Sequence, residues 1–188
     1  MKNIILFLIL IVFASSSHQH STKTTHPSHT THTSHTTHPS HTSHPSHSSH
    51  HSQYSRHSTK NCQVDDPSIQ RKARSLRGKT QEETARNIFK YVQTQIRYER
   101  YANSKKGAAK TLLTRKGNCC DQAHLLVALW RAAGIDARYA HGTDHWWGQC
   151  IINGKAYDCD PTNQKHEFGR PHHSSKDMHP QYYEELDH

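Results

Sequence analysis

The chain has 188 residues, of which 31% are hydrophobic and 21% charged, and its formal net charge is +9 with neutral histidine. Of its 21 histidines, 13 lie between His18 and His57, in a stretch with no acidic residue and a single aromatic one. Such a stretch cannot bury a core, which excludes one globular domain over the whole length. We expect one folded domain of about 100 to 125 residues, enough for a modest core, from roughly residue 60 onward.

The first seventeen residues have the pattern of a secretory signal peptide. A short positive start precedes the apolar run 4–13, and small residues follow it. Ten helical residues rise about 15 Å, half of the roughly 30 Å hydrocarbon core, so the run is a poor membrane span. We therefore predict a signal peptide over 1–17 and a secreted, extracellular mature chain without a membrane span.

Residues 18–61 are predicted to be a disordered, low-complexity spacer rich in His, Ser and Thr. Nine histidines follow a strict period of three from His26 to His50, which is the repeat of a polyproline II helix. Neighbouring imidazoles would then lie about 9 Å apart, too far to share a metal ion with bonds of about 2 Å. We interpret the segment as a tether. Metal capture by a folded form of it is the alternative, and glycans on Ser or Thr are left open.

Three helices are predicted before residue 117. Asp66 followed by Pro67 is a typical helix start, and Thr80 with Glu83 has the capping-box pattern that begins a second helix over 81–97. A short third helix is expected over 107–115. The basic run around the first helix lacks interleaved aromatic residues. We interpret it as a solvated face, so no nucleic acid is expected among the partners.

The fourth predicted helix is the most informative. Asn118 can cap a helix that begins at Cys119. Its residues are apolar on most sides through Ala133, so we expect a buried central helix. Gly134 then ends it in the left-handed conformation, and 135–142 has an extended pattern.

A β-hairpin is predicted around Asn153-Gly154, the strongest short-range hairpin signal. A two-residue turn pairs 152 with 155, and counting back pairs 149 with 158, 147 with 160 and 145 with 162. On that register His145 and Asp160 are diagonal neighbours on one face of the hairpin.

Cys119, His145 and Asp160 have the residue types of a nucleophile, its base and an orienting carboxylate. A cysteine at a helix N-terminus has a stabilised thiolate, and its own backbone N–H can help to bind an oxyanion. Histidine can take the thiol proton and later protonate a leaving amine. Spacing alone leaves disulfide bonding of the five cysteines open.

Three motifs in this order resemble the transglutaminase-like superfamily. They are GNCCDQAHL with LWRAAGIDARY over 117–139, HWW at 145–147 and DCDPT at 158–162. Within the superfamily, the GNCCD and YDCD forms resemble methanogen pseudomurein endoisopeptidases. The resemblance covers about 80–163.

This resemblance implies an α+β, papain-like core, in which a central helix carries the cysteine and packs on a small antiparallel sheet. It implies Cys119 as nucleophile, His145 as base and Asp160 as orienting residue, in agreement with the hairpin register. The chemistry that this resemblance implies requires no cofactor, and calcium dependence is left open.

Other residues compete for these roles. Cys120 and His124 are four apart and could pair, but Cys120 is one residue deeper in the helix. We interpret His141 as structural, Asp158 as solvated and Asp121 as a complement to the helix N-terminus.

The cysteines other than Cys119 are Cys62, Cys120, Cys150 and Cys159, which allow three pairings. Cys150 and Cys159 would share a hairpin face diagonally, so a bridge between them is plausible on this register.

We predict a catalytic domain over 62–165 and a polar tail over 166–188. The favoured function is a cysteine hydrolase that cleaves peptide or isopeptide bonds, with a peptide or a pseudomurein-like cell-wall polymer as substrate. The alternatives are an acyl transferase that crosslinks proteins through the same thioester, and a non-enzymatic surface or metal-binding protein. The oligomeric state is not predicted.

Overall fold

The computed structural model describes residues 56–171 and 179–186. The expected signal peptide and most of the expected spacer lie outside these residues. The helices are α1 (Pro67–Ser75), α2 (Gln81–Gln95), α3 (Gly107–Thr114) and α4 (Cys119–Ala132). The strands are β1 (Arg97–Tyr98), β2 (Lys116–Gly117), β3 (Asp136–His141), β4 (Trp146–Ile152), β5 (Lys155–Cys159) and β6 (Gln181–Tyr183). The predicted α+β class is confirmed.

The predicted helix starts are confirmed by their caps. The Asp66 carboxylate accepts the Ser68 N–H (2.8 Å), and the Thr80 hydroxyl accepts the Glu83 N–H (3.0 Å). Helix α2 ends two residues earlier than predicted, because Ile96 is already extended (φ −109°, ψ 115°) and leads into β1. Local side-chain bonds to free backbone N–H groups thus set where these helices begin.

The larger sheet has the strand order β5-β4-β3-β6, with all neighbours antiparallel. The predicted hairpin register is confirmed from Ile152↔Lys155 to Gly148↔Cys159. The two outermost predicted pairs, 147 with 160 and 145 with 162, are not formed as strand pairs. Beyond β5 the Asp160 carboxylate accepts the Thr162 N–H (2.9 Å), which turns the chain away from β4.

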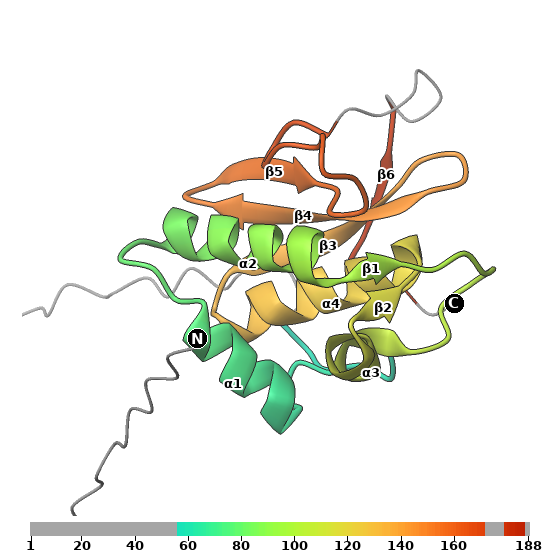
Figure 1. Cartoon of the computed structure of the whole chain (residues 1–188). Coiled ribbons are helices and arrows are strands. Elements are labelled where there is room, and N and C mark those ends of the chain that lie inside the picture. The colour runs from blue at the N-terminus through green and yellow to red at the C-terminus, as the bar shows by residue number, and fades with distance from the viewer. Residues whose placement is uncertain (1–55, 172–178, 187–188) are drawn as a thin grey trace, which may run out of the picture. The chain divides into compact units, whose positions relative to one another are not determined.

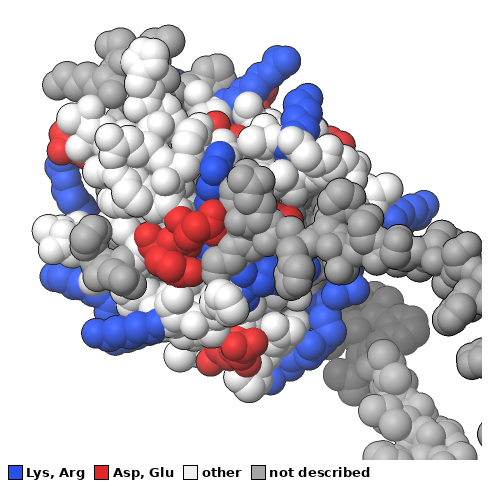
Figure 2. Space-filling model, turned by 180° about the vertical axis from the view of Figure 1, so that it is seen from behind, with Lys and Arg blue, Asp and Glu red and all other residues white. Residues whose placement is uncertain are grey.

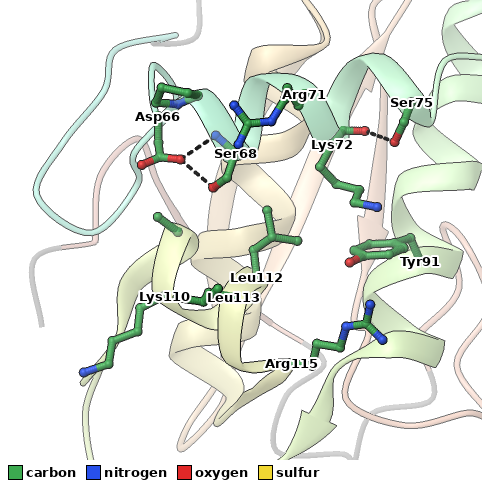
Figure 3. A pocket seen from close by; sticks show the side chains of 12 residues that line it. Asp66, Ser68, Arg71, Lys72, Ser75, Tyr91, Lys110, Leu112, Leu113 and Arg115 are labelled. Carbon is green, nitrogen blue, oxygen red and sulfur yellow. Dashed lines mark hydrogen bonds between the residues drawn. The ribbon is translucent and has the colours of Figure 1, made fainter.

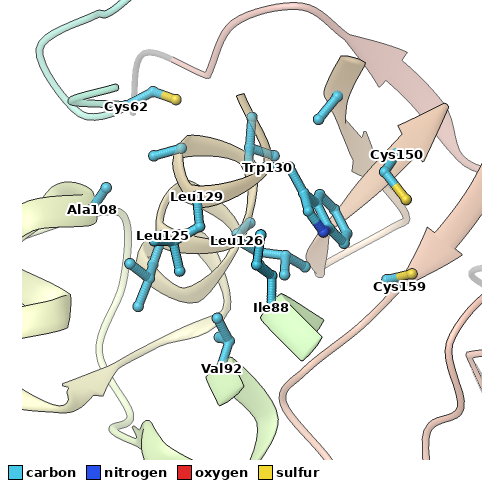
Figure 4. Packing of buried hydrophobic residues seen from close by; sticks show 14 of the residues in the cluster. Cys62, Ile88, Val92, Ala108, Leu125, Leu126, Leu129, Trp130, Cys150 and Cys159 are labelled. Atoms are coloured by element: carbon cyan, nitrogen blue, oxygen red, sulfur yellow. The ribbon is translucent and has the colours of Figure 1, made fainter. Parts of the chain in front are cut away.

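Helix α4 is the centre of the domain. It packs on β3 and β4 on one side and on the other three helices around it (Figure 1). Twelve of its fourteen residues are buried, from Cys120 to Arg131. Figure 4 shows its leucines and Trp130 within the cluster of apolar side chains. The predicted buried central helix is therefore confirmed.

Gly148 lets α4 approach β4 closely. A Cβ atom at this position would lie 2.9 Å from the Trp130 ring and 3.0 Å from a Leu126 methyl group, closer than real Cβ contacts. The helix that begins at Cys119 and the strand that follows His145 are thereby held at a short, fixed separation.

The predicted polar tail over 166–188 is wrong in part. Strand β6 extends the sheet along β3, and Leu186 is only 2% exposed. The buried Arg131 guanidinium donates to the Glu184 carbonyl (2.6 Å) and pairs with Glu185 (3.3 Å). The fold thus extends to the last described residues, because a buried guanidinium on α4 requires acceptors that this segment supplies.

The predicted start of the domain at residue 62 is also too late. Arg56 forms an ion pair with Asp136 on β3 (2.7 Å). Among the residues that the structure describes, no helix is both long enough and apolar enough to cross a membrane.

Candidate active site

The N-terminus of α4 positions Cys119. Asn118 caps the helix by accepting the Asp121 N–H (2.9 Å). Its side-chain amide donates to the carbonyls of Tyr101 (3.0 Å) and Asn103 (2.8 Å). The cap is therefore fixed from both sides, and the partly buried Cys119 thiol stands at the positive end of the helix dipole.

The structure brings the three predicted site residues together. His145 Nε2 lies 2.8 Å from Asp160 Oδ2, and Asp160 is completely buried while the His145 side chain is 23% exposed. The other carboxylate oxygen accepts the Thr162 hydroxyl (2.6 Å). Asp160 is thus held rigidly, and His145 reaches both the carboxylate and the Cys119 sulfur, with which it also forms a hydrogen bond.

The electrostatics favour a thiolate at Cys119. A hydrogen bond from the Cys120 thiol is the main cause that lowers the Cys119 pKa to about 4. Burial opposes this shift, whereas hydrogen bonds from the His145 ring and the Trp146 N–H reinforce it. Burial also lowers the His145 pKa, but the bonds to Asp160 and Cys119 outweigh it and raise the pKa to about 10. The pair is therefore thiolate and imidazolium near neutral pH.

The thiolate gives a testable pH dependence. Since the Cys119 pKa is lowered, the thiolate is present above about pH 4 and is lost as the pH falls through that value. Replacement of His145 by Ala removes a hydrogen bond and a positive charge next to the Cys119 sulfur. We therefore expect the pH midpoint of the Cys119 titration to rise by at least about one unit, which is a tenfold change in the thiolate-to-thiol ratio at a given acid pH. The midpoint is measured from the rate of Cys119 alkylation by iodoacetamide, followed by peptide mass spectrometry.

The exposed His179 offers a matched control. Its replacement by Ala also removes an imidazole and should leave the midpoint unchanged. An unchanged midpoint in the His145 variant would contradict the ion pair.

Tyr98 is a site residue that the sequence analysis missed. Its phenol forms a hydrogen bond with the Cys119 side chain, while burial and the Cys119 charge raise the Tyr98 pKa. The parallel pairing of β1 with β2 places Tyr98 opposite Gly117, two residues before Cys119. A strand of two residues has no periodic signal, so no pattern in the sequence indicated this contact.

His166 is a second missed residue. Its Nδ1 lies 3.0 Å from Asp160 Oδ2, the same oxygen that contacts His145. Gln93 on α2 donates to the main-chain carbonyl of His166 (2.8 Å), which fixes the position of the segment. Asp160 therefore lies between two imidazoles. His166 is the first residue of the predicted polar tail.

Asp121 has a larger role than the predicted complement to the helix N-terminus. It is completely buried and accepts the Ser104 hydroxyl (2.6 Å), the Gly107 N–H (3.0 Å) and the Tyr101 hydroxyl. Burial raises its pKa, but the bonds from Ser104 and Tyr101 outweigh this and lower it. Asp121 thus anchors the loop over 101–107, whose carbonyls hold Asn118.

The alternative pair of Cys120 and His124 is not formed. His124 bonds instead to the Tyr139 hydroxyl (3.0 Å), and burial lowers its pKa to about 4. The hydrogen bond to Cys119 raises the Cys120 pKa, so Cys120 stays a thiol and is a poor nucleophile. His141 stacks on the Trp146 ring, with centroids 4.0 Å apart.

The predicted solvation of Asp158 is wrong in part, because its half-buried side chain also has donors within the protein. Its carboxylate accepts from the Trp147 indole (3.0 Å), Gln149 (3.3 Å) and the Tyr182 hydroxyl (3.1 Å). The donors come from β4 and from the C-terminal β6, and only the fold brings the latter to Asp158.

All five cysteines are free in the structure. Cys150 and Cys159 adjoin each other across the hairpin and their side chains form a hydrogen bond, but no bridge joins them. In the described part of the chain, no group of three or more His, Cys, Asp or Glu side chains is arranged to hold a metal ion.

Comparison with known families agrees with this geometry. Residues 70–161 match the transglutaminase-like superfamily. Among solved structures, a proposed cysteine protease from Cytophaga hutchinsonii is similar, with 28% identity and a TM-score of 0.51 over 57% of this chain. The match covers only 40% of that protein.

A proposed protease from Parabacteroides distasonis is more remote. It has 16% identity and a TM-score of 0.41, over 49% of this chain and 22% of its own. No curated protein matches the sequence.

Proposed function

We propose that this protein is a cysteine peptidase that cleaves peptide or isopeptide bonds through an acyl-enzyme. In this proposal Cys119 is the nucleophile, His145 the general acid and base, and Asp160 the carboxylate that orients it. The observation that carries the proposal is the position of His145, hydrogen-bonded to Cys119 on one side and to the buried Asp160 carboxylate, at 2.8 Å, on the other. The transglutaminase-like match over 70–161 supports it.

The first half-reaction forms a thioester. The Cys119 thiolate attacks the carbonyl carbon, and the new C–S bond places a negative charge on the oxygen. The Cys119 N–H, at the helix start, is available to stabilise this oxyanion. As the C–N bond breaks, the His145 imidazolium gives its proton to the leaving nitrogen, which departs as a neutral amine.

The second half-reaction releases the acid. Neutral His145 takes a proton from water as the water oxygen attacks the thioester carbon. The C–S bond then breaks, which restores the Cys119 thiolate and the His145 imidazolium, and the acyl group leaves as a carboxylic acid. Asp160 keeps the ring in position in both steps.

The substrate proposed for this site is a peptide or isopeptide bond in a cell-wall polymer, and the proposed location is outside the cell. The motif resemblance to pseudomurein endoisopeptidases supports the substrate. The apolar run 4–13, with the small residues after it, supports secretion.

A pre-steady-state assay tests this mechanism. With an isopeptide whose leaving amine is fluorescent, we expect a burst of about one amine per enzyme, provided that deacylation is the slower step. Acid quenching followed by mass spectrometry should locate the acyl group on the Cys119 peptide. A product amide that forms in the presence of added amine would identify acyl transfer, and the absence of any acyl adduct on Cys119 would contradict the proposal.

A further inference from the structure

A groove outside the candidate active site lies between the helices. It has a volume of about 910 Å³ and is lined from α1, α2, α3 and the residue after α3, and none of Cys119, His145 and Asp160 contributes to it. Figure 3 shows its side chains from close by. We call it the α1–α3 groove and define it by six residues: Arg71, Lys72, Tyr91, Lys110, Leu113 and Arg115.

The four cations of this groove form no salt bridge within the described residues. Among the described residues, none of Arg71, Lys72, Lys110 and Arg115 forms an ion pair. Cations elsewhere do so, as Arg86 does with Glu82 (2.6 Å).

One acidic side chain, that of Asp66, lines the groove, and its charge attracts Arg71. On the face turned away in Figure 1, Asp and Glu gather in a few compact groups, with Lys and Arg spread around them (Figure 2). The acid that lines the groove, Asp66, is engaged as the cap of α1, where it accepts the Ser68 N–H (2.8 Å) and hydroxyl (2.5 Å). The groove thus presents four cations and one carboxylate, and this net positive charge attracts an anionic occupant.

Apolar side chains line the groove together with the cations. Leu113 is 82% exposed, so its side chain is accessible to an occupant of the groove. Tyr91 lies between Lys72 and Arg115 (Figure 3), with the Lys72 amine 4.6 Å from the ring centroid. An occupant that matches this surface has carboxylates at its sides and an apolar side chain between them.

We propose that the α1–α3 groove binds an acidic peptide segment, in which two or more carboxylates flank an apolar side chain. A nucleic acid would use the cations, but it has no aliphatic group for Leu113, and the Lys72 amine already lies over the face of the Tyr91 ring. An anionic bilayer is flat and does not enter a groove. This site is separate from the proposed catalytic residues and does not depend on their activity.

Binding is measured on the full chain with Cys119 replaced by Ala, so that catalysis plays no part. The probe is a fluorescein-labelled Asp-Glu-Leu-Glu-Asp peptide, and fluorescence anisotropy reports its binding. An Asn-Gln-Leu-Gln-Asn peptide tests the carboxylates, and Asp-Glu-Gly-Glu-Asp tests the apolar side chain. We expect both changes to weaken binding, and raising NaCl from about 50 to about 300 mM to weaken it further, because salt screens exposed charges.

Charge reversal locates the site. Lys72→Glu with Arg115→Glu should weaken peptide binding at least tenfold. Arg74→Glu with Lys79→Glu makes the same change in net charge at exposed positions outside the groove, and should change the affinity less than threefold. Leu113→Ser alters one exposed side chain, so it tests the groove with little risk to folding, and it should weaken binding several-fold.

Four results would overturn the proposal. They are no binding of the acidic peptide, equal binding of the neutral peptide, equal losses in the two charge-reversal pairs, or no loss in Leu113→Ser. Tighter binding of a single-stranded RNA or of anionic phospholipid vesicles than of the peptide, lost in the same groove variants, would assign the groove to that ligand instead.

Discussion

Replacement of Cys119 by Ala is expected to lower turnover of an isopeptide substrate by at least about a thousandfold, because no other group in the site can form the thioester. Cys120 is adjacent in the chain but is only 6% exposed, and its hydrogen bond to Cys119 raises its pKa. The substitution removes one sulfur from the surface of α4, so we expect the fold and the thermal transition to be retained. Initial rates measure the turnover, and a circular dichroism melt measures the thermal transition.

Cys120 supplies the matched control. Its replacement by Ala also removes one thiol, yet it leaves the nucleophile in place, so we expect turnover at neutral pH within about tenfold of the wild type. The Cys120 thiol is the main cause of the lowered Cys119 pKa, so the acid limb of kcat/KM should move to higher pH. The opposite result, an active Cys119 variant and an inactive Cys120 variant, would assign the nucleophile to Cys120.

Replacement of Asp121 by Ala is expected to lower the free energy of unfolding by about 3 kcal/mol, because several donors lose their acceptor and each buried one left unpaired costs about 1–3 kcal/mol. The change leaves the Ser104 hydroxyl and the Lys106 and Gly107 N–H groups without their acceptor. The loop over 101–107 then no longer holds Asn118. Urea denaturation measures the loss, and the alkylation rate of Cys119 reports on the helix cap.

Asp66 allows a comparison in the same protein. It is also a helix-capping acid, but it is partly exposed and its bonds are confined to α1. Its replacement by Ala should cost only about 1 kcal/mol, the usual value for a cap. Similar losses in the free energy of unfolding for the two variants would show that Asp121 is an ordinary capping residue and does not anchor the loop over 101–107.

Short-range features were predictable because neighbours in the chain determine them. The Thr80 hydroxyl caps α2 through the N–H three residues on, and Asn153 with Gly154 takes positive φ angles that set a two-residue turn. From that turn the register of β4 and β5 followed by counting. The same register predicted that His145 and Asp160 are neighbours, although the pairing of β4 with β5 ends at Cys159.

Contacts between distant segments were not predictable in the same way. His166 is 73 residues from Gln93, which fixes it, and β6 pairs with β3 across forty or more residues. Neither segment has a periodic apolar pattern, so both were assigned to a loose tail. The packing of α3 beside α1 likewise creates a basic groove that no single run of sequence contains.

The sequence by itself determined the helix starts and the hairpin register, because each depends on bonds or spacings within a few residues. It also identified Cys119, His145 and Asp160 as candidate site residues, through that register and the order of the motifs. The tertiary structure decided the surroundings of those residues: Tyr98 at the sulfur, His166 at the carboxylate and Asp121 under the loop. Buried polar groups require partners. Which distant side chains supply them is decided only when the helices and the sheet close around α4.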